Sequence, residues 1–546
     1  MIDANRWALV GAERMRALDR HTIDELGVPG ELLMESAGRA VVDALLAECA
    51  DVLALPGTEV LVLCGGGNNG GDGLVVARHL ELLKWPVRVA LLGNAARMTG
   101  DAAANLARAR AAGVRIEEGQ AADFDGSGVL VDAIFGTGLA RDVEGDLARV
   151  IEGINTEGRA RYRVVSVDLP SGLDADTGQV QGIAVQADLT VTIACPKLGL
   201  ALEPGRSLAG AVRVARIGIA DALPGELRAE GLEAAQLWTR AAAGEALPAR
   251  PTIGHKGHFG HVLVLAGSEG KTGAAALAAR AAGRSGAGLV TLGCPRGLND
   301  VLEVSCTEAM TVPLPDTKER AFAEDALDAA VALAAERDVV AVGPGIGRAA
   351  ETVAFVRGLA AKSALPMVID ADGLNAFEND AAALRARPAA TVLTPHPGEA
   401  ARLLQSGASE INCDRVGAAR ELAAASGTVV LLKGAASVIA APDGRVIVNP
   451  TGGPALASGG TGDVLTGVVA ALLAQGLSPF EAAAAAAYLH GAAADRVAEA
   501  MGSAGLLAGD VADALPATMR HLREEARHAP ADRAFARGTL LAFPDA

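Results

Sequence analysis

The chain has 546 residues, of which 51% are apolar, 66 are glycine and 3% are aromatic, and its formal net charge is −17. This length exceeds what one hydrophobic core usually serves, so we expect two domains. The negative charge argues against nucleic acid or an anionic membrane as a partner, because both would need a basic face. The six cysteines are widely spaced, which predicts reduced thiols in a cytoplasmic protein.

Short apolar runs alternate with helical patterns from residue 58 to about residue 220. The runs are EVLVLCG, VRVALLG, GVLVDAIFG, RVVSVDLPSG, DLTVTIAC and VRVARIGI. Strands that alternate with helices predict a parallel sheet covered by helices. We therefore expect an α/β domain over residues 1–225.

A polar, proline-containing stretch interrupts this rhythm, and residues 226–250 are predicted to form a linker. The rhythm resumes with GHVLVLAGS and continues through AGLVTLGC, DVVAVGPGIG, PMVIDADGL, ATVLTPHPGEA, TVVLLKGAASVIA and GRVIVNP. Three helical segments follow. The pattern predicts a second α/β domain over residues 251–528 and a loose tail over residues 529–546.

The stretch CGGGNNGGDG, residues 64–73, joins the first predicted strand to a helix. Glycines permit a sharp turn and a close ligand, and the helix directs its free N–H groups at the loop, which is typical of phosphate binding. The pattern fits neither the P-loop nor the usual dinucleotide fingerprint. A tight turn without a ligand would not need two asparagines and an aspartate among the glycines.

Polar residues also follow two later strands. Asp132 lies in VDAIFGTGLARD, and Asp168 and Ser171 lie in VSVDLPSGLDADTG. Because the carboxyl ends of parallel strands meet at one crevice, we expect them near Asn69 and Asp72. Carboxylate, amide and hydroxyl oxygens suit a hard cation, and at least one of these groups could transfer a proton.

LLMESAG, CGGGNNGGDGLVVARHL, VDAIFGTGL and VDLPSGLDADTG resemble the N-terminal domain of the bifunctional NAD(P)H-hydrate repair enzymes, the YjeF type. The resemblance implies a Rossmann-like epimerase that interconverts the R and S forms of NAD(P)HX, the hydrate of the reduced nicotinamide ring. It implies substrate contacts at Asn68, Asn69, Gly70, Gly71, Asp72, Gly136, Thr137, Gly138, Leu139, Ala140, Arg141, Asp142 and Asp168. It implies a potassium ion at Asn69, Asp132 and Ser171. Asp72 and Asp168 are both candidates for the catalytic base.

The strongest single motif is NPTGGPALASGGTGDVLTGVV, residues 449–469. Its glycine-rich turn leads into a helix near Asp463, so backbone N–H groups could form an anion hole beside a carboxylate. Asp463 could merely cap the helix, but Gly459, Gly460 and Gly462 favour a catalytic role. In phosphoryl transfer such a carboxylate takes the proton from the accepting hydroxyl.

This motif resembles ribokinase-like enzymes, and HKGHFGHVLVLAGS, GKTGAAALAARAAGRSGAGLV, GPGIG, VIDADGLNAF, LTPHPGEAARLL and LLKGAAS narrow the resemblance to the ADP-dependent NAD(P)HX dehydratase domain. In that family the hydroxyl of the S hydrate is phosphorylated and phosphate then leaves, giving NAD(P)H, AMP and phosphate. The resemblance implies hydrate contacts at Ala274, Gly347, His396 and Asp463, and nucleotide contacts at Lys433, Gly434, Ala435, Ala436, Ser437 and Gly462. It also implies Mg²⁺ with the ADP.

Two alternatives stay open. A kinase for a small hydroxylated heterocycle, of the hydroxymethylpyrimidine or thiazole type, would share the glycine-rich turn and Asp463, but it leaves NNGGDG without a role. A non-catalytic nucleotide-binding module would not need both Asp72 and Asp168 beside an anionic ligand. We further expect NADHX, NADPHX and ADP as the small-molecule partners, a homo-oligomer, and a mobile HKGHFGH loop over the second site rather than a zinc cluster.

Overall fold

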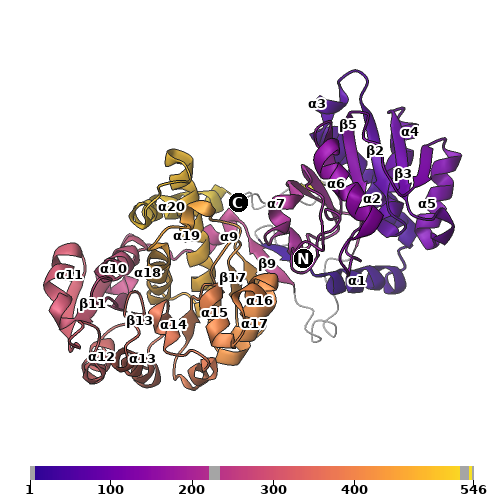
Figure 1. The fold of residues 1–546 in the computed structure, drawn as a ribbon. Coiled ribbons are helices and arrows are strands. Elements are labelled where there is room, and N and C mark those ends of the chain that lie inside the picture. Colours follow the sequence, from indigo (N-terminus) through magenta and orange to yellow (C-terminus); the bar gives the residue numbers. More distant parts are fainter. Residues whose placement is uncertain (1–5, 220–233, 529–539, 544–546) are drawn as a thin grey trace. The chain divides into compact units, whose positions relative to one another are not determined.

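The computed structural model describes residues 6–219, 234–528 and 540–543, and the chain divides into two compact units, residues 1–235 with 531–545 and residues 236–530. Each unit is a sheet flanked by helices (Figure 1). This confirms the predicted fold class, a Rossmann-like unit followed by a ribokinase-like α/β unit. Within the described ranges no helix is long and apolar enough to span a bilayer.

The sheet of the first unit has the order β19-β8-β7-β6-β5-β2-β3-β4 and is parallel except for the pair β19 and β8. Its strands are β2 (Glu59–Cys64), β3 (Val87–Leu92), β4 (Arg115–Gly119), β5 (Gly128–Ala133), β6 (Tyr162–Val167), β7 (Leu189–Ile193), β8 (Ala211–Ala215) and β19 (Leu540–Ala542). The main helices are α1 (Ala12–Arg20), α2 (Gly30–Glu48), α4 (Asn68–Leu82), α5 (Gly100–Ala111) and α6 (Gly145–Gly153). The six strands predicted for this unit are confirmed.

Strand β2 shows why the central strands read as continuous apolar runs. Val60 and Val62 belong to a core shared with α2 and α4, whereas Leu61 and Leu63 belong to a separate core on the α6 side. Both faces of the sheet are therefore covered, and alternation with polar residues disappears. Strand β4 escaped prediction because it is a polar, largely exposed edge strand.

In the second unit the order from β9 to β12 is β9-β18-β17-β16-β15-β14-β13-β10-β11-β12. The strands are β9 (Ala235–Trp238), β10 (His261–Leu265), β11 (Leu289–Pro295), β12 (Met310–Leu314), β13 (Val339–Val342), β14 (Met367–Ile369), β15 (Thr391–Leu393), β16 (Val429–Leu432), β17 (Val438–Ala440) and β18 (Val446–Val448). The helices used below are α9 (Arg240–Ala246), α10 (Thr272–Arg284), α15 (Pro397–Leu404), α17 (Arg415–Ser426), α18 (Thr461–Ala474), α19 (Pro479–Met501) and α20 (Ala508–His528). Strands β16, β17 and β18 pair antiparallel, because the short turns between them leave no room for a crossover helix.

The structure differs from the predicted boundaries at two places. The predicted linker contains β9, which pairs with β18, and α9, in which a Cβ on Gly244 would lie 2.0 Å from the Leu522 carbonyl oxygen of α20. The predicted tail contains β19, which pairs with β8. Both strands are mostly apolar but only four and three residues long, which is too short for periodicity to reveal them. Residues 226–233 of the predicted linker and residues 529–539 and 544–546 of the predicted tail lie outside the described residues.

The HKGHFGH segment does not lie where we predicted it. It contains a short helical turn, Lys256–Phe259, and a Cβ on Gly260 would lie 2.2 Å from the carbonyl oxygen of Ala474, the last residue of α18. Asp463 is in the first turn of that helix. Since a 14-residue helix is about 21 Å long, the segment lies at the opposite end of α18 from the predicted catalytic residue.

Close packing of α10 and α18 generates a stability prediction. A Cβ on Gly467 would lie 2.2 Å from the Ala278 carbonyl oxygen, whereas a Cβ on the exposed Gly283 would meet nothing within 4 Å. We expect Gly467→Ala to destabilise the second unit by about 1–3 kcal/mol through overpacking. The matched control Gly283→Ala should stabilise it by about 0.5–1 kcal/mol, because alanine loses less backbone entropy in a helix. Urea unfolding followed by circular dichroism measures both, and a similar shift for the two variants would contradict the packing argument.

Candidate active sites

The asparagines and the aspartate of the glycine-rich stretch lie in the first turns of α4 rather than in a loop before it. Asn69 and Asp72 are three residues apart in this helix and so share one face. A Cβ on Gly70 would lie 1.9 Å from the Gly65 carbonyl oxygen. Glycine at this position therefore lets the helix begin directly against the end of β2, with its free N–H groups beside the polar side chains.

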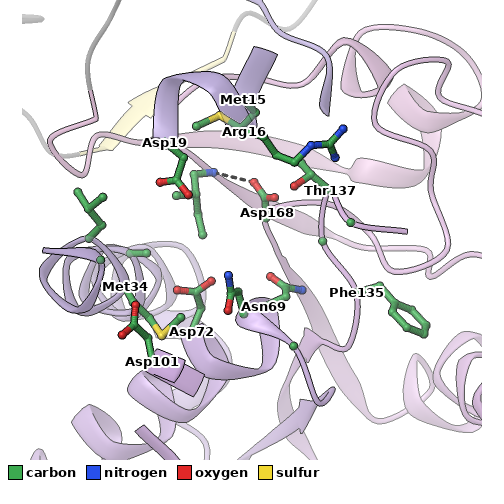
Figure 2. A pocket seen from close by; sticks show the side chains of 18 of the residues that line it. Met15, Arg16, Asp19, Met34, Asn69, Asp72, Asp101, Phe135, Thr137 and Asp168 are labelled. Atoms are coloured by element: carbon green, nitrogen blue, oxygen red, sulfur yellow. Dashed lines mark hydrogen bonds between the residues drawn. The ribbon is translucent and has the colours of Figure 1, made fainter. Parts of the chain in front are cut away.

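A cavity of about 610 Å³ lies beside this helix start (Figure 2). Of the predicted substrate contacts, those that line it are Asn68, Asn69, Asp72, Gly136, Thr137, Gly138, Leu139 and Asp168. The others do not line it: Gly70 is buried against the Gly65 backbone and Gly71 against the Met34 side chain, and Ala140, Arg141 and Asp142 are exposed. The structure thus brings part of each predicted loop to one cavity, together with Asp168: the two ends of the first loop and the first four residues of the second.

Asp168 is held in an unusual backbone conformation at the end of β6. Its φ is +69°, and the N–H of Leu169 donates to the Val167 carbonyl at 2.9 Å, which makes a γ-turn with Asp168 at its centre. Such a strained turn is characteristic of functional positions. The carboxylate accepts a hydrogen bond from the Ile193 N–H at 3.1 Å and forms an ion pair with Lys197 (Figure 2).

Asp72 faces the same cavity from α4 in a different electrostatic setting. Burial raises its pKa well above the usual range, and the negative charges of Asp168 and Asp19 raise it further, although Lys197 opposes them. None of the described residues donates a hydrogen bond to its carboxyl group. Asp72 therefore favours its protonated form, next to an Asp168 that is paired with a cation.

Of the three predicted potassium ligands, Asp132 and Ser171 are in direct contact, and only Asn69 lines the cavity. Asp132 is fully buried and accepts hydrogen bonds from Ser171 Oγ at 2.5 Å, the Ser171 N–H at 2.9 Å and Ser166 Oγ at 2.8 Å. Burial raises its pKa despite these donors. Asn69 lines the cavity, and its buried Nδ2 has no hydrogen-bond partner among the described residues. A Cβ on Gly136 would lie 3.4 Å from both Asn69 Cγ and Asp168 Oδ2, so these two side chains lie beside the same loop residue.

Sequence reasoning missed the charged residues that complete this cavity. They are Arg16 and Asp19 of α1, Asp101 of α5, and Lys197 beyond β7. Lys197 follows the run DLTVTIAC, so the rule that strand ends converge, which located Asp132 and Asp168, would also have located it. Arg16, Asp19 and Asp101 lie on the helices α1 and α5 rather than after a strand, so this rule could not locate them.

In the second unit, α18 begins beside a glycine-rich turn. Its N-cap residue, Gly460, has a φ of +91°, and Asp463 lies in the first helical turn rather than at the cap. Burial raises the pKa of Asp463 to about 7, with Asp370 adding to the effect and Lys433 opposing it. None of the described residues donates a hydrogen bond to the Asp463 carboxyl group, so it is free to accept a proton from a ligand near neutral pH.

Lys433 is the central cation of this site. Its Nζ donates to Asp370 Oδ1 at 2.7 Å, and it lies 3.9 Å from Glu399 Oε2. Burial alone would lower its pKa, but these two carboxylates raise it. The other oxygen of Asp370 accepts from Thr466 Oγ1 of α18 at 2.6 Å, so one buried carboxylate ties the lysine to the helix.

The remaining predicted nucleotide contacts form the hairpin turn between β16 and β17. Gly434 has a φ of +143° and Ala436 a φ of +52°, and Ser437 Oγ donates to the Gly434 carbonyl at 3.0 Å. A Cβ on Gly462 would lie 3.5 Å from Lys433 Nζ. Ala435 at the tip is exposed. The structure therefore places this turn, through Lys433, beside the start of α18.

His396 and Glu399 form a capping box at the start of α15. His396 Nδ1 accepts from the Gly398 N–H at 3.0 Å, and Glu399 Oε2 accepts from the His396 N–H at 2.8 Å. The histidine is therefore not a core residue: its side chain is 52% exposed and its ring is fixed by the helix start. Burial of the ring lowers its pKa, which favours the neutral form.

The other two predicted hydrate contacts lie at a neighbouring loop. The Gly347 N–H donates to Asp372 Oδ2 at 3.1 Å, and Ala274 Cβ would be 3.1 Å from a Cβ on Gly345. Asp372 also binds Lys271 at 2.8 Å and Arg348 at 3.0 Å. No motif in the sequence singles out these two cations, whose side chains are half exposed.

Known proteins resemble both units. A family model described as YjeF-related protein N-terminus matches residues 30–199, and one described as NAD(P)H-hydrate dehydratase matches residues 262–517. A bifunctional NAD(P)H-hydrate repair enzyme from Moorella thermoacetica is 46% identical over 525 residues, which cover 95% of this chain and 97% of that protein. One from Thermofilum pendens is 39% identical over 518 residues, covering 94% and 96%.

Among solved structures, the ADP/ATP-dependent NAD(P)H-hydrate dehydratase from Bacillus subtilis, co-crystallized with ATP/Mg²⁺, is 33% identical and covers 52% of this chain and 98% of its own, with a TM-score of 0.46. The two family models together span more than half of the chain, in the order of the two sites. Full-length relatives share that order. The chain therefore belongs to the family of bifunctional NAD(P)H-hydrate repair enzymes.

Proposed function

We propose that this chain repairs hydrated NADH and NADPH in two steps. The first unit interconverts the R and S hydrates, and the second dehydrates the S form with ADP, releasing AMP and phosphate. The observation that carries the proposal is that each family model covers the unit holding the corresponding carboxylates, Asp72 and Asp168 in one and Asp463 in the other. The heterocycle kinase is not favoured, because it leaves the match over residues 30–199 without a function.

In the second unit, Asp463 is proposed to take the proton from the hydroxyl of the hydrate. The N–H groups at the start of α18 would stabilise negative charge on the transferred phosphoryl group, and Lys433 would offset the charge of the nucleotide. His396, Gly347 and Ala274 would position the hydrate. Mg²⁺ would be held mainly through the phosphates of the ADP, which is its usual mode of binding.

We further propose potassium in the first unit. Asn69, Asp132 and Ser171 supply the amide, carboxylate and hydroxyl oxygens that a hard cation prefers, and the Asp132 carboxylate is fully buried. The ion would offset the buried charge of Asp132. A cytoplasmic location fits the six cysteines, none of which forms a disulfide bond within the described residues, and a homo-oligomer stays a prediction.

The first test is recovery of reduced nicotinamide from racemic NADHX. With ADP, the chain should restore nearly all of the absorbance, because epimerisation feeds the R form to a dehydratase that consumes the S form. Parallel reactions receive ATP or no nucleotide. Recovery that stops near half would remove the epimerase from the proposal, and no recovery with either nucleotide would overturn the dehydratase.

Single substitutions should separate the two activities. Asp463→Asn removes the proton acceptor and should lower dehydration by at least about 100-fold while epimerisation continues. Asp168→Asn should lower epimerisation by a similar factor while dehydration of the S hydrate continues. The rates are measured on separated R and S hydrates. Loss of both activities in either variant would contradict two independent sites.

Potassium should stabilise the first unit. We expect KCl to raise the thermal midpoint of that unit relative to equal concentrations of NaCl or choline chloride, because only the matched cation relieves the burial of the Asp132 carboxylate. Asp132→Asn should abolish the difference between the salts. An identical midpoint in all three salts would argue against a potassium site.

A further inference from the structure

Lys197 is the feature of the first site that the predicted residues leave without a function. Its side chain is only 1% exposed, yet it lines the cavity. The first 235 residues contain only two lysines, and the other, Lys84, is exposed on the loop after α4. A lysine that is fully removed from water costs free energy unless its charge is compensated, so its position calls for a specific partner.

That partner is Asp168, and the backbone around the lysine is shaped to hold the pair. Lys197 Nζ contacts Asp168 Oδ1 and donates to the Ile193 carbonyl at 2.7 Å. Ala194, which follows that carbonyl, has a φ of +63°, and the Cys195 N–H donates to the Ile193 carbonyl at 2.9 Å. Adjacent strands β6 and β7 thus both end in a γ-turn, one presenting the carboxylate and the other an acceptor for the ammonium group.

The other charged groups at the cavity come from different elements. Burial raises the pKa of Asp72 on α4 and of Asp19 on α1, and the positive charge of Lys197 opposes both shifts. Arg16 and Asp101 also line the cavity. Among the described residues, only Asp168 accepts a hydrogen bond from the Lys197 ammonium with its carboxylate. The lysine therefore distinguishes the two candidate catalytic carboxylates, which lie on different walls of the cavity (Figure 2).

We infer that Lys197 is a positioning residue for epimerisation: its ion pair orients the Asp168 carboxylate as the proton acceptor, and it leaves Asp72 as the proton donor. The inference rests on the proposed function of the first unit. Nothing in this assignment requires Lys197 itself to touch the substrate.

The chemistry balances with these two carboxyl groups. Asp72 gives its proton to the hydroxyl of the hydrate. The carbon–oxygen bond then breaks and a water molecule departs. The ring that remains is positively charged, and the charge is shared between the carbon and the ring nitrogen. A water molecule then adds to the opposite face of the same carbon, forming a new carbon–oxygen bond, and Asp168 takes its extra proton. Exchange of one proton with solvent restores the neutral Asp72 and the ionised Asp168.

The test follows relaxation of the pure R hydrate to the mixture of both forms without nucleotide, so that the second unit is idle, with the spontaneous rate subtracted. We expect Lys197→Met to lower kcat by at least about 100-fold, the lower end of what a positioned proton-transfer group contributes. The acidic limb of its pH profile should move to higher pH, because loss of the cation favours protonation of the cavity carboxyl groups. Lys197→Arg, which keeps the charge, should restore a large part of the rate.

Three controls keep the inference falsifiable. Lys84→Met should leave epimerisation unchanged, and dehydration of the S hydrate with ADP should persist in every variant, which shows that the chain is folded. In a chain that already carries Asp168→Asn, Lys197→Met should lower kcat for epimerisation only slightly further, because both substitutions act through the same carboxylate. A parent chain without epimerase activity would overturn the proposed function itself. If the parent chain is active, two results would overturn only the role of Lys197. One is a Lys197→Met variant with the parent's kcat and pH profile, and the other is a double variant in which the losses of kcat are fully additive.

Discussion

Removing a carboxylate from water is costly, and the arrangement of both units follows from how that cost is met. In the first unit, Asp168 has a buried lysine and Asp132 has several hydrogen-bond donors, while Asp72 has neither. In the second unit, Asp370 has Lys433 and Thr466, while Asp463 has no hydrogen-bond donor among the described residues. Each site therefore combines compensated carboxylates that hold the structure with an uncompensated one whose pKa is raised. The raised pKa suits the uncompensated group to exchange a proton with a ligand, and in the first unit the compensated Asp168 is proposed as the partner that takes up a proton.

Parallel sheets make this division possible. The carboxyl ends of adjacent strands lie close together, so a side chain from one strand end can hold a side chain from the next. Lys197 follows β7 and holds Asp168 at the end of the adjacent strand β6. Lys433 at the end of β16 reaches past β15 to hold Asp370 at the end of β14. The helix that starts nearby, α4 or α18, supplies the uncompensated carboxylate together with free N–H groups. Two different folds thus reach the same arrangement by the same geometry.

Periodicity predicted the buried strands of both units because each is apolar on both faces, and the glycine-rich stretches predicted where the helices start. It could not predict β9 or β19, because strands this short are identified only by their pairing with β18 and β8. The left-handed backbone of Asp168 and Ala194 has no signal in residue type, since neither is glycine. Lysine is a residue type usually found at the surface, and only the pairing of Lys197 with Asp168 at the end of the neighbouring strand explains why it is buried. Pairing across strands, rather than local pattern, is the information that one sequence lacks.

The net charge of −17 and the anionic ligands proposed for both sites are compatible for the same reason. The lysines at the sites, among them Lys197 and Lys433, are paired with carboxylates, and backbone N–H groups at helix starts offer the ligand phosphates contacts that add no net charge. Long-range attraction would then contribute little to binding, because the field of the whole chain repels anions. Affinity must come from short-range contacts inside the sites, where salt screens charges far less than at the surface. Recognition by shape and by backbone donors, rather than by a basic surface, is what allows so acidic a chain to act on dinucleotides.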